Sequence, residues 1–147
     1  MARAPTPWLT TRAQIALAAC ACAGASAFLY AVDPARHAVY PQCLLYNATG
    51  YYCAGCGATR AIHALLHGRV IEALHDNALF VAALPFLAGF AGWSLWQTWQ
   101  KNAWPEWRFP RATAAWSGAG IFLLLTVFTI LRNLPGWPFA WLRPISR

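Results

Sequence analysis

Three long apolar segments separated by polar stretches dominate the pattern of the chain. They cover residues 14–32, 78–96 and 112–131 and contain no Asp, Glu, Lys or Arg. An α-helix rises about 1.5 Å per residue, so about 20 residues cross the roughly 30 Å hydrocarbon layer of a bilayer. The pattern therefore predicts an all-α integral membrane protein, with about three transmembrane helices in a single domain over residues 1–147.

Residues 33–77 form the polar part of the chain, a loop that holds three of the four acidic residues, all four histidines and three of the five cysteines. Within it, residues 58–67 carry apolar side chains at helical spacing, which predicts a short interfacial amphipathic helix. Gly68 is expected to end this helix, and Asp76 or Asn77 to cap the next one. The apolar face is predicted to consist of Ala61, Ile62, Leu65 and Leu66.

Composition supports the membrane class and argues against nucleic acid as a partner. The chain is 59% hydrophobic and 10% charged, whereas soluble domains carry about 25% charged residues. The net charge of +7 comes from basic residues scattered singly along the chain. Basic side chains at the ends of apolar segments meet anionic lipid head groups, so the bilayer is the expected partner.

The basic residues around the first span indicate its orientation. Arg3 and Arg12 precede the span, whereas Arg36 follows it beside Asp33. The positive-inside rule then places the N-terminus in the cytoplasm and the cysteine loop on the outer side of a bacterial cytoplasmic membrane. The basic residues and Ala25–Ala27 also fit a cleaved signal peptide. The apolar run continues beyond that site, which favours a retained span.

Three cysteines of the loop have a spacing that fits either a disulfide or a metal site. Cys43, Cys53 and Cys56 follow the pattern Cys-x9-Cys-x2-Cys. A disulfide from Cys43 to one of the other two is the preferred interpretation in an oxidising compartment. The alternative is zinc, with His63 or His67 completing four ligands.

Enzymatic chemistry ranks behind a binding role. The pair Cys53 and Cys56 precedes a predicted helix, whose dipole favours a thiolate, but the sequence offers no strands for a thioredoxin-like sheet. No nucleophile-elbow motif, phosphate loop or carboxylate pair is present. A small-solute carrier or channel subunit is a third hypothesis. The absence of charged residues inside the apolar segments argues against it.

Two arginines near the predicted membrane boundary need partners. Arg60 and Arg132 are expected mainly to reach lipid phosphate, with an internal partner such as Glu72 or Asp76 as the alternative.

One set of loop residues and the exit of the third span form a combined pattern: Cys43, Thr49-Gly50, Cys53, Gly55-Cys56-Gly57, Thr59-Arg60-Ala61, Leu66, Gly68, Ala73-Leu74, Asn77 and Leu131-Arg132-Asn133-Leu134-Pro135. This pattern resembles that of a family of small bacterial membrane proteins, domain-of-unknown-function family 2752. The departures are Leu44, Ala54 and Ala78 at positions where the family often has proline, and Arg69 where it often has an acid.

The resemblance implies a multi-span membrane protein and supplies no activity. The chain is therefore interpreted as a non-enzymatic binding or assembly component, with a protein partner or a second copy as its target and the cysteine loop as a structural cap. The residues expected to have structural or partner-binding roles are Thr59, Arg60, Asn77, Arg132 and Asn133.

Overall fold

The computed structural model describes residues 11–36, 40, 43–101, 103, 105 and 110–144, and of residues 111 and 112 only the backbone. Arg3, used above for orientation, lies outside the described residues. Within the described part the protein is helical and has no strand. The elements are α1 (Thr11–Ala31), α2 (Leu44–Thr49), α3 (Ala58–Leu66), α4 (Val70–Lys101), α5 (Arg111–Asn133) and the 3-10 helix η1 (Phe139–Leu142).

Three helices are long and apolar enough to cross a membrane, which confirms the predicted spans. They are α1, α4 and the part of α5 from Thr113 to Asn133. Their large apolar side chains point outward, as at Phe86, Trp116 and Phe122. Such surfaces suit lipid, because the helix satisfies its own backbone groups and the side chains meet hydrocarbon tails.

The long helix α4 is divided at Asn77. The backbone there is extended (φ −160°, ψ 91°), and the Asn77 Oδ1 atom accepts a hydrogen bond from the Phe80 N–H at 3.0 Å. This is the geometry of an N-cap, in which a side-chain oxygen satisfies an N–H of the first turn. The predicted cap is thus confirmed at Asn77, after which α4 continues as a helix from residue 78 to Lys101.

Helix α3 matches the predicted amphipathic helix in extent but not fully in its buried face. Gly68 follows it with φ +72°, the left-handed conformation that ends helices. Ala61 is buried as predicted, whereas Leu66 is exposed and His63 and Ala64 are buried instead. Leu66, a member of the predicted apolar face, is exposed because α3 packs on α4 through small side chains, which let the two backbones approach closely.

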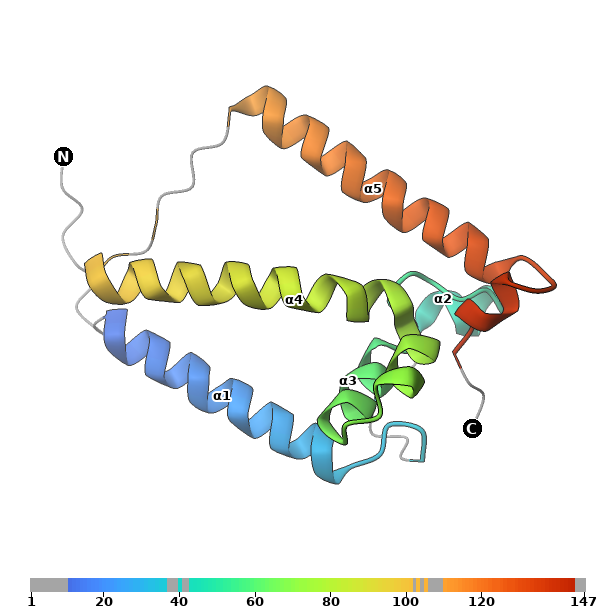
Figure 1. Ribbon diagram of the computed structural model, residues 1–147, viewed down its shortest axis with the longest axis horizontal. Coiled ribbons are helices and arrows are strands. Elements are labelled where there is room, and N and C mark those ends of the chain that lie inside the picture. The colour runs from blue at the N-terminus through green and yellow to red at the C-terminus, as the bar shows by residue number, and fades with distance from the viewer. Residues whose placement is uncertain are drawn as a thin grey trace.

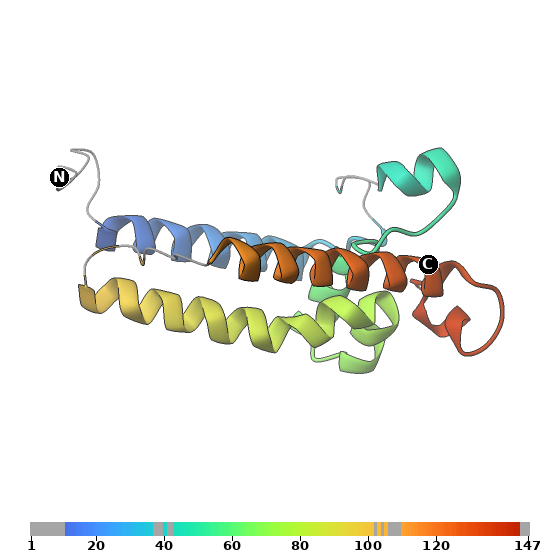
Figure 2. The same cartoon turned by 90° about the horizontal axis from the view of Figure 1, so that it is seen from above.

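The short helices gather at one end of the molecule (Figures 1 and 2). Helix α1 packs against α3 and α4, and η1 packs against both α4 and α5. Along most of its length α5 diverges from α4 in Figure 1, and it approaches the other elements at its C-terminal end. We call α2, α3, the loop of residues 50–57 and η1 the cap.

Candidate functional site: a three-cysteine cluster in the cap

Helix α2 brings the first cysteine to the other two. It begins directly after Cys43 and ends at Gly50, whose φ of +75° and N–H bond to the Tyr46 carbonyl (2.8 Å) reverse the chain. The chain then returns past α2, so that the Cys43 Sγ lies 3.3 Å from the Cys53 Sγ. The sequence had not predicted α2, and the cluster depends on it.

Consecutive tight turns place the second pair of sulfurs. The Cys56 N–H donates to the Cys53 carbonyl (3.1 Å), and the Cys53 N–H donates to the Cys56 Sγ (3.2 Å). The two Sγ atoms are 3.2 Å apart. All three sulfurs, those of Cys43, Cys53 and Cys56, therefore lie within 4.8 Å of one another.

Gly57 is required by the close approach of the loop to α4. Its φ is +84°, and a Cβ atom there would lie 2.3 Å from the backbone oxygen of Asp76. A side chain would therefore be both strained in its backbone conformation and in collision with an oxygen atom that belongs to the helix. The absence of a side chain at Gly57 therefore allows the loop backbone to pack directly against the backbone of α4.

Arg132 binds the loop from α5. Its side chain is fully buried, and its guanidinium donates to the carbonyl oxygens of Cys53 (2.8 Å), Cys56 (3.1 Å) and Asp76 (3.3 Å). It also lies over the rings of Tyr52 and Phe128. The expectation that Arg132 reaches lipid phosphate was wrong, because these carbonyl oxygens enclose the guanidinium within the protein.

Two asparagines complete the support of the same loop. Asn133 accepts from the Tyr52 N–H (2.9 Å) and donates to the Tyr52 carbonyl (2.8 Å). Asn77 donates to the carbonyls of Ala54 (2.8 Å) and Cys56 (3.2 Å). The backbone of residues 52–56 is therefore held from two helices, by Asn77 of α4 and by Arg132 and Asn133 of α5.

Arg143, for which no role was predicted from sequence, caps the C-terminal end of α5. Its guanidinium donates to the carbonyls of Arg132 (3.3 Å), Asn133 (3.1 Å) and Leu134 (3.2 Å). These carbonyls lack helical partners, and a cation there also meets the negative end of the helix dipole. Its position shortly after the predicted end of a helix could have indicated this role, because basic residues there often bind the last carbonyls of the helix.

The two histidines lie apart from the sulfur cluster. The His63 Nδ1 is 2.6 Å from the Leu29 carbonyl of α1, and the His67 Nδ1 is 2.9 Å from the His63 carbonyl. The His67 ring stacks on Tyr30 with a centroid distance of 4.2 Å. The structure thus uses His63 and His67 where α3 meets α1, and it does not bring them to the cysteines.

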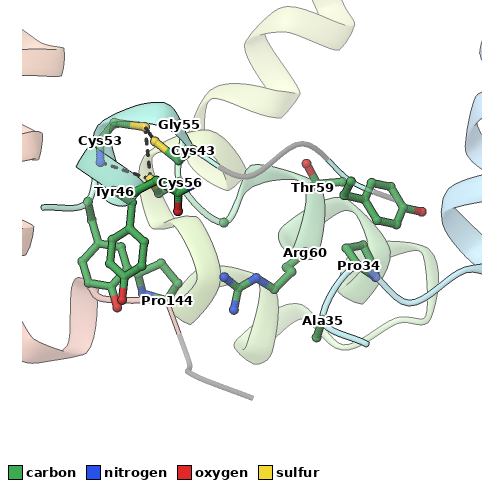
Figure 3. A pocket seen from close by; sticks show the side chains of 14 residues that line it. Pro34, Ala35, Cys43, Tyr46, Cys53, Gly55, Cys56, Thr59, Arg60 and Pro144 are labelled. Carbon is green, nitrogen blue, oxygen red and sulfur yellow. Dashed lines mark hydrogen bonds between the residues drawn. The ribbon is translucent and has the colours of Figure 1, made fainter. Parts of the chain in front are cut away.

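The cluster lines a pocket of about 590 Å³ (Figure 3). Thr59 and Arg60 line the same pocket from the first turn of α3, and Arg60 extends into it. The predicted polar residues therefore divide into two groups. Asn77, Arg132 and Asn133 hold the loop, whereas Thr59 and Arg60 face the space beside it.

The environments of the thiols differ. Backbone N–H groups in the first turn of α2, chiefly that of Tyr46, favour the Cys43 thiolate and lower the Cys43 pKa to about 7. Burial raises the Cys56 pKa to about 12. A thiolate is the nucleophilic and metal-binding form of cysteine, so in the reduced, metal-free cap Cys43 ionises at lower pH than Cys56.

Fold and site together define a small multi-span membrane protein with a three-cysteine cap at one end of its spans. Residues 43–91 match the family described as "Protein of unknown function (DUF2752)". The match confirms the resemblance drawn from the cysteine loop, and it covers α2, α3 and two thirds of α4. No curated protein and no solved structure matched the chain.

Proposed function

We propose that the protein is a non-enzymatic membrane binding or assembly component, whose cap is a rigid platform for a segment of a partner protein. The observation that carries this proposal is the convergence of Arg132, Asn133 and Asn77 on the loop backbone. Polar groups at the end of a membrane span are costly unless they are satisfied. Here they are used to hold one short loop in one conformation beside a pocket.

The placement of charge supports binding over transport. In the described spans the charged residues lie near the ends, and none lies midway. A path for ions or protons through a membrane requires polar or charged groups at depth. The spans are therefore better suited to anchoring the cap than to conducting a solute.

The cap is proposed to face the outer side of the membrane. Arg12 and Lys101 lie at the other end of α1 and α4, where Figure 1 shows these two helices side by side. Basic residues flanking spans favour the cytoplasmic side. A cap on the outer side would meet extracytoplasmic partners.

A photoreactive amino acid at position 59 tests the proposal in intact cells. Thr59 lines the pocket, so irradiation is expected to give one discrete protein adduct. The same amino acid at Phe86, which is 79% exposed on α4, is the matched control and is expected to give lipid adducts. Lipid adducts alone at both positions would refute a protein-binding cap, and an adduct with the mass of a dimer would identify a second copy as the partner.

A further inference from the structure

Among the described residues, the buried guanidinium of Arg132 has no carboxylate within ion-pair distance. Within the described residues its partners are neutral carbonyl oxygens, and neither the Arg36–Asp33 nor the Arg69–Glu72 ion pair involves it. Its Nε atom is buried and has no hydrogen-bond partner. A cation removed from water needs a nearby negative charge. The ionisable side chains that most favour its charge are those of Cys56 and Cys53, which carry two of the three sulfurs.

A disulfide between two of the sulfurs would be neutral, so only the third sulfur could then carry a negative charge. Three thiolates around one divalent cation also carry a single net negative charge, which the Arg132 guanidinium balances. A metal–thiolate centre therefore meets the requirement of the buried arginine and uses all three sulfurs of the cluster.

The sulfur positions fit such a centre. Zinc–sulfur bonds of about 2.3 Å in a tetrahedral site place the sulfurs roughly 3.8 Å apart. The cluster has sulfur separations of 3.2 and 3.3 Å, and all lie within 4.8 Å. Small rotations of the side chains would bring the three sulfurs to equal distances from one ion.

We propose that Cys43, Cys53 and Cys56 are the thiolate ligands of one zinc ion whose fourth coordination position opens into the pocket, with Arg132 as the counter-charge. The cluster contains no fourth protein ligand among the described residues, and all three cysteines line the pocket. Structural zinc sites are closed by four protein ligands, whereas sites with three keep a position for water or an added ligand. The open position would accept an exogenous thiol or imidazole.

Metal analysis of the full chain tests the ligand set. Purified in detergent without reductant, the protein is expected to hold one zinc, and Cys53→Ser is expected to lose it. Cys20→Ser is the matched control, because Cys20 is an exposed residue of α1 outside the cluster. Two oxidised cysteines without metal, copper in place of zinc, or full zinc retention in Cys53→Ser would overturn the proposal.

Two further measurements cover a Cys53→Ser variant that fails to fold and the role of Arg132. Alkylation of the native protein should modify three more thiols after zinc is chelated than before, and equal numbers would contradict thiolate ligation. Arg132→Gln should weaken zinc binding 10–100-fold, as happens when a group that supports the metal ligands is removed. Arg132→Lys should restore part of the affinity. Unchanged zinc affinity in Arg132→Gln would refute the counter-charge.

Cobalt substitution tests the open position. Cobalt(II) in the site is expected to show thiolate charge-transfer absorption, and added imidazole should shift its ligand-field bands. A spectrum insensitive to imidazole would overturn the open fourth position. The inference does not depend on a partner protein, so a failure of the metal experiments would leave the photocrosslinking test of the cap intact.

Discussion

Replacement of Arg132 by methionine measures how strongly α5 holds the cysteine loop. The substitution removes three hydrogen bonds from a charged donor, to Cys53, Cys56 and Asp76, each worth about 1.5–3 kcal/mol net. It also removes the desolvation cost of the guanidinium, which is several kcal/mol. The Cys53 and Cys56 carbonyls keep second partners, the Cys56 N–H and the Asn77 amide. We therefore expect the free energy of opening the loop to fall by about 2–3 kcal/mol.

Alkylation of Cys56 in reduced, metal-free protein reports this opening. The residue is only 8% exposed, so it reacts mainly when the loop opens, and its rate follows the free energy of local unfolding. A loss of about 2–3 kcal/mol corresponds to an alkylation rate roughly 30–150 times higher, at about 1.4 kcal/mol per factor of ten. The rate is read by mass spectrometry at fixed pH and reagent concentration.

Two variants separate the hydrogen bonds from the charge. Arg132→Lys keeps the charge, but its ammonium cannot serve several carbonyls as a planar guanidinium does, so an intermediate rate is expected. Arg36→Met removes an exposed arginine, whose side chain is 82% exposed beside Asp33, and should change the rate less than about twofold, as exposed ion pairs contribute little. A Cys56 rate in Arg132→Met that matches this control would refute the role assigned to Arg132.

Three more predictions concern the loop and its surroundings. Gly57→Ala should prevent the loop from seating, because its Cβ would lie 2.3 Å from the Asp76 oxygen, whereas Gly89→Ala, which meets open space, should leave thermal unfolding unchanged; equal melting temperatures would contradict this. In reduced, metal-free protein at pH 7, Cys43 should be alkylated well before Cys56, because its pKa is lowered to about 7 and that of Cys56 is raised to about 12; the Cys43 rate should be half-maximal near pH 7 and level about one pH unit above it, and the reverse order of labelling would contradict the assignment. An impermeant thiol reagent should label a variant with Cys43 as its single cysteine in intact cells, and labelling only after lysis would place the cap in the cytoplasm.

The parts of the fold that follow from local patterns were predictable. The three spans are continuous apolar runs, and Asn77 precedes one of them as capping residues do, so neither needs knowledge of distant contacts. Helix α2 was missed because it is only six residues long, Leu44–Thr49. Short helices depend on their surroundings more than on their own propensity.

The parts of the site that depend on distant contacts were not predictable. Arg132 lies 79 residues after Cys53, the residue whose carbonyl it binds. From sequence alone, a single arginine at the end of a span is interpreted as a contact with lipid phosphate. For a similar reason, the predicted apolar face of α3 did not tell which of its residues are buried, since Leu66 is exposed. In a membrane protein a leucine can face lipid while small residues form the helix contacts, so apolar character does not tell buried positions from outward ones.

The cap also determines how α5 is attached to the rest of the protein. Among the described elements α5 packs mainly against η1. Arg143 binds the carbonyls at its C-terminal end, and the side chains of Arg132 and Asn133 hold the backbone of residues 52–56. The sulfur cluster lies on that same backbone. Any change at the cluster that moves the carbonyls of Cys53 or Cys56 therefore alters the bonds that anchor α5. The cap end of α5 is thus anchored to the same loop that carries the cysteines, through hydrogen bonds of 2.8–3.1 Å from Arg132 to the Cys53 and Cys56 carbonyls.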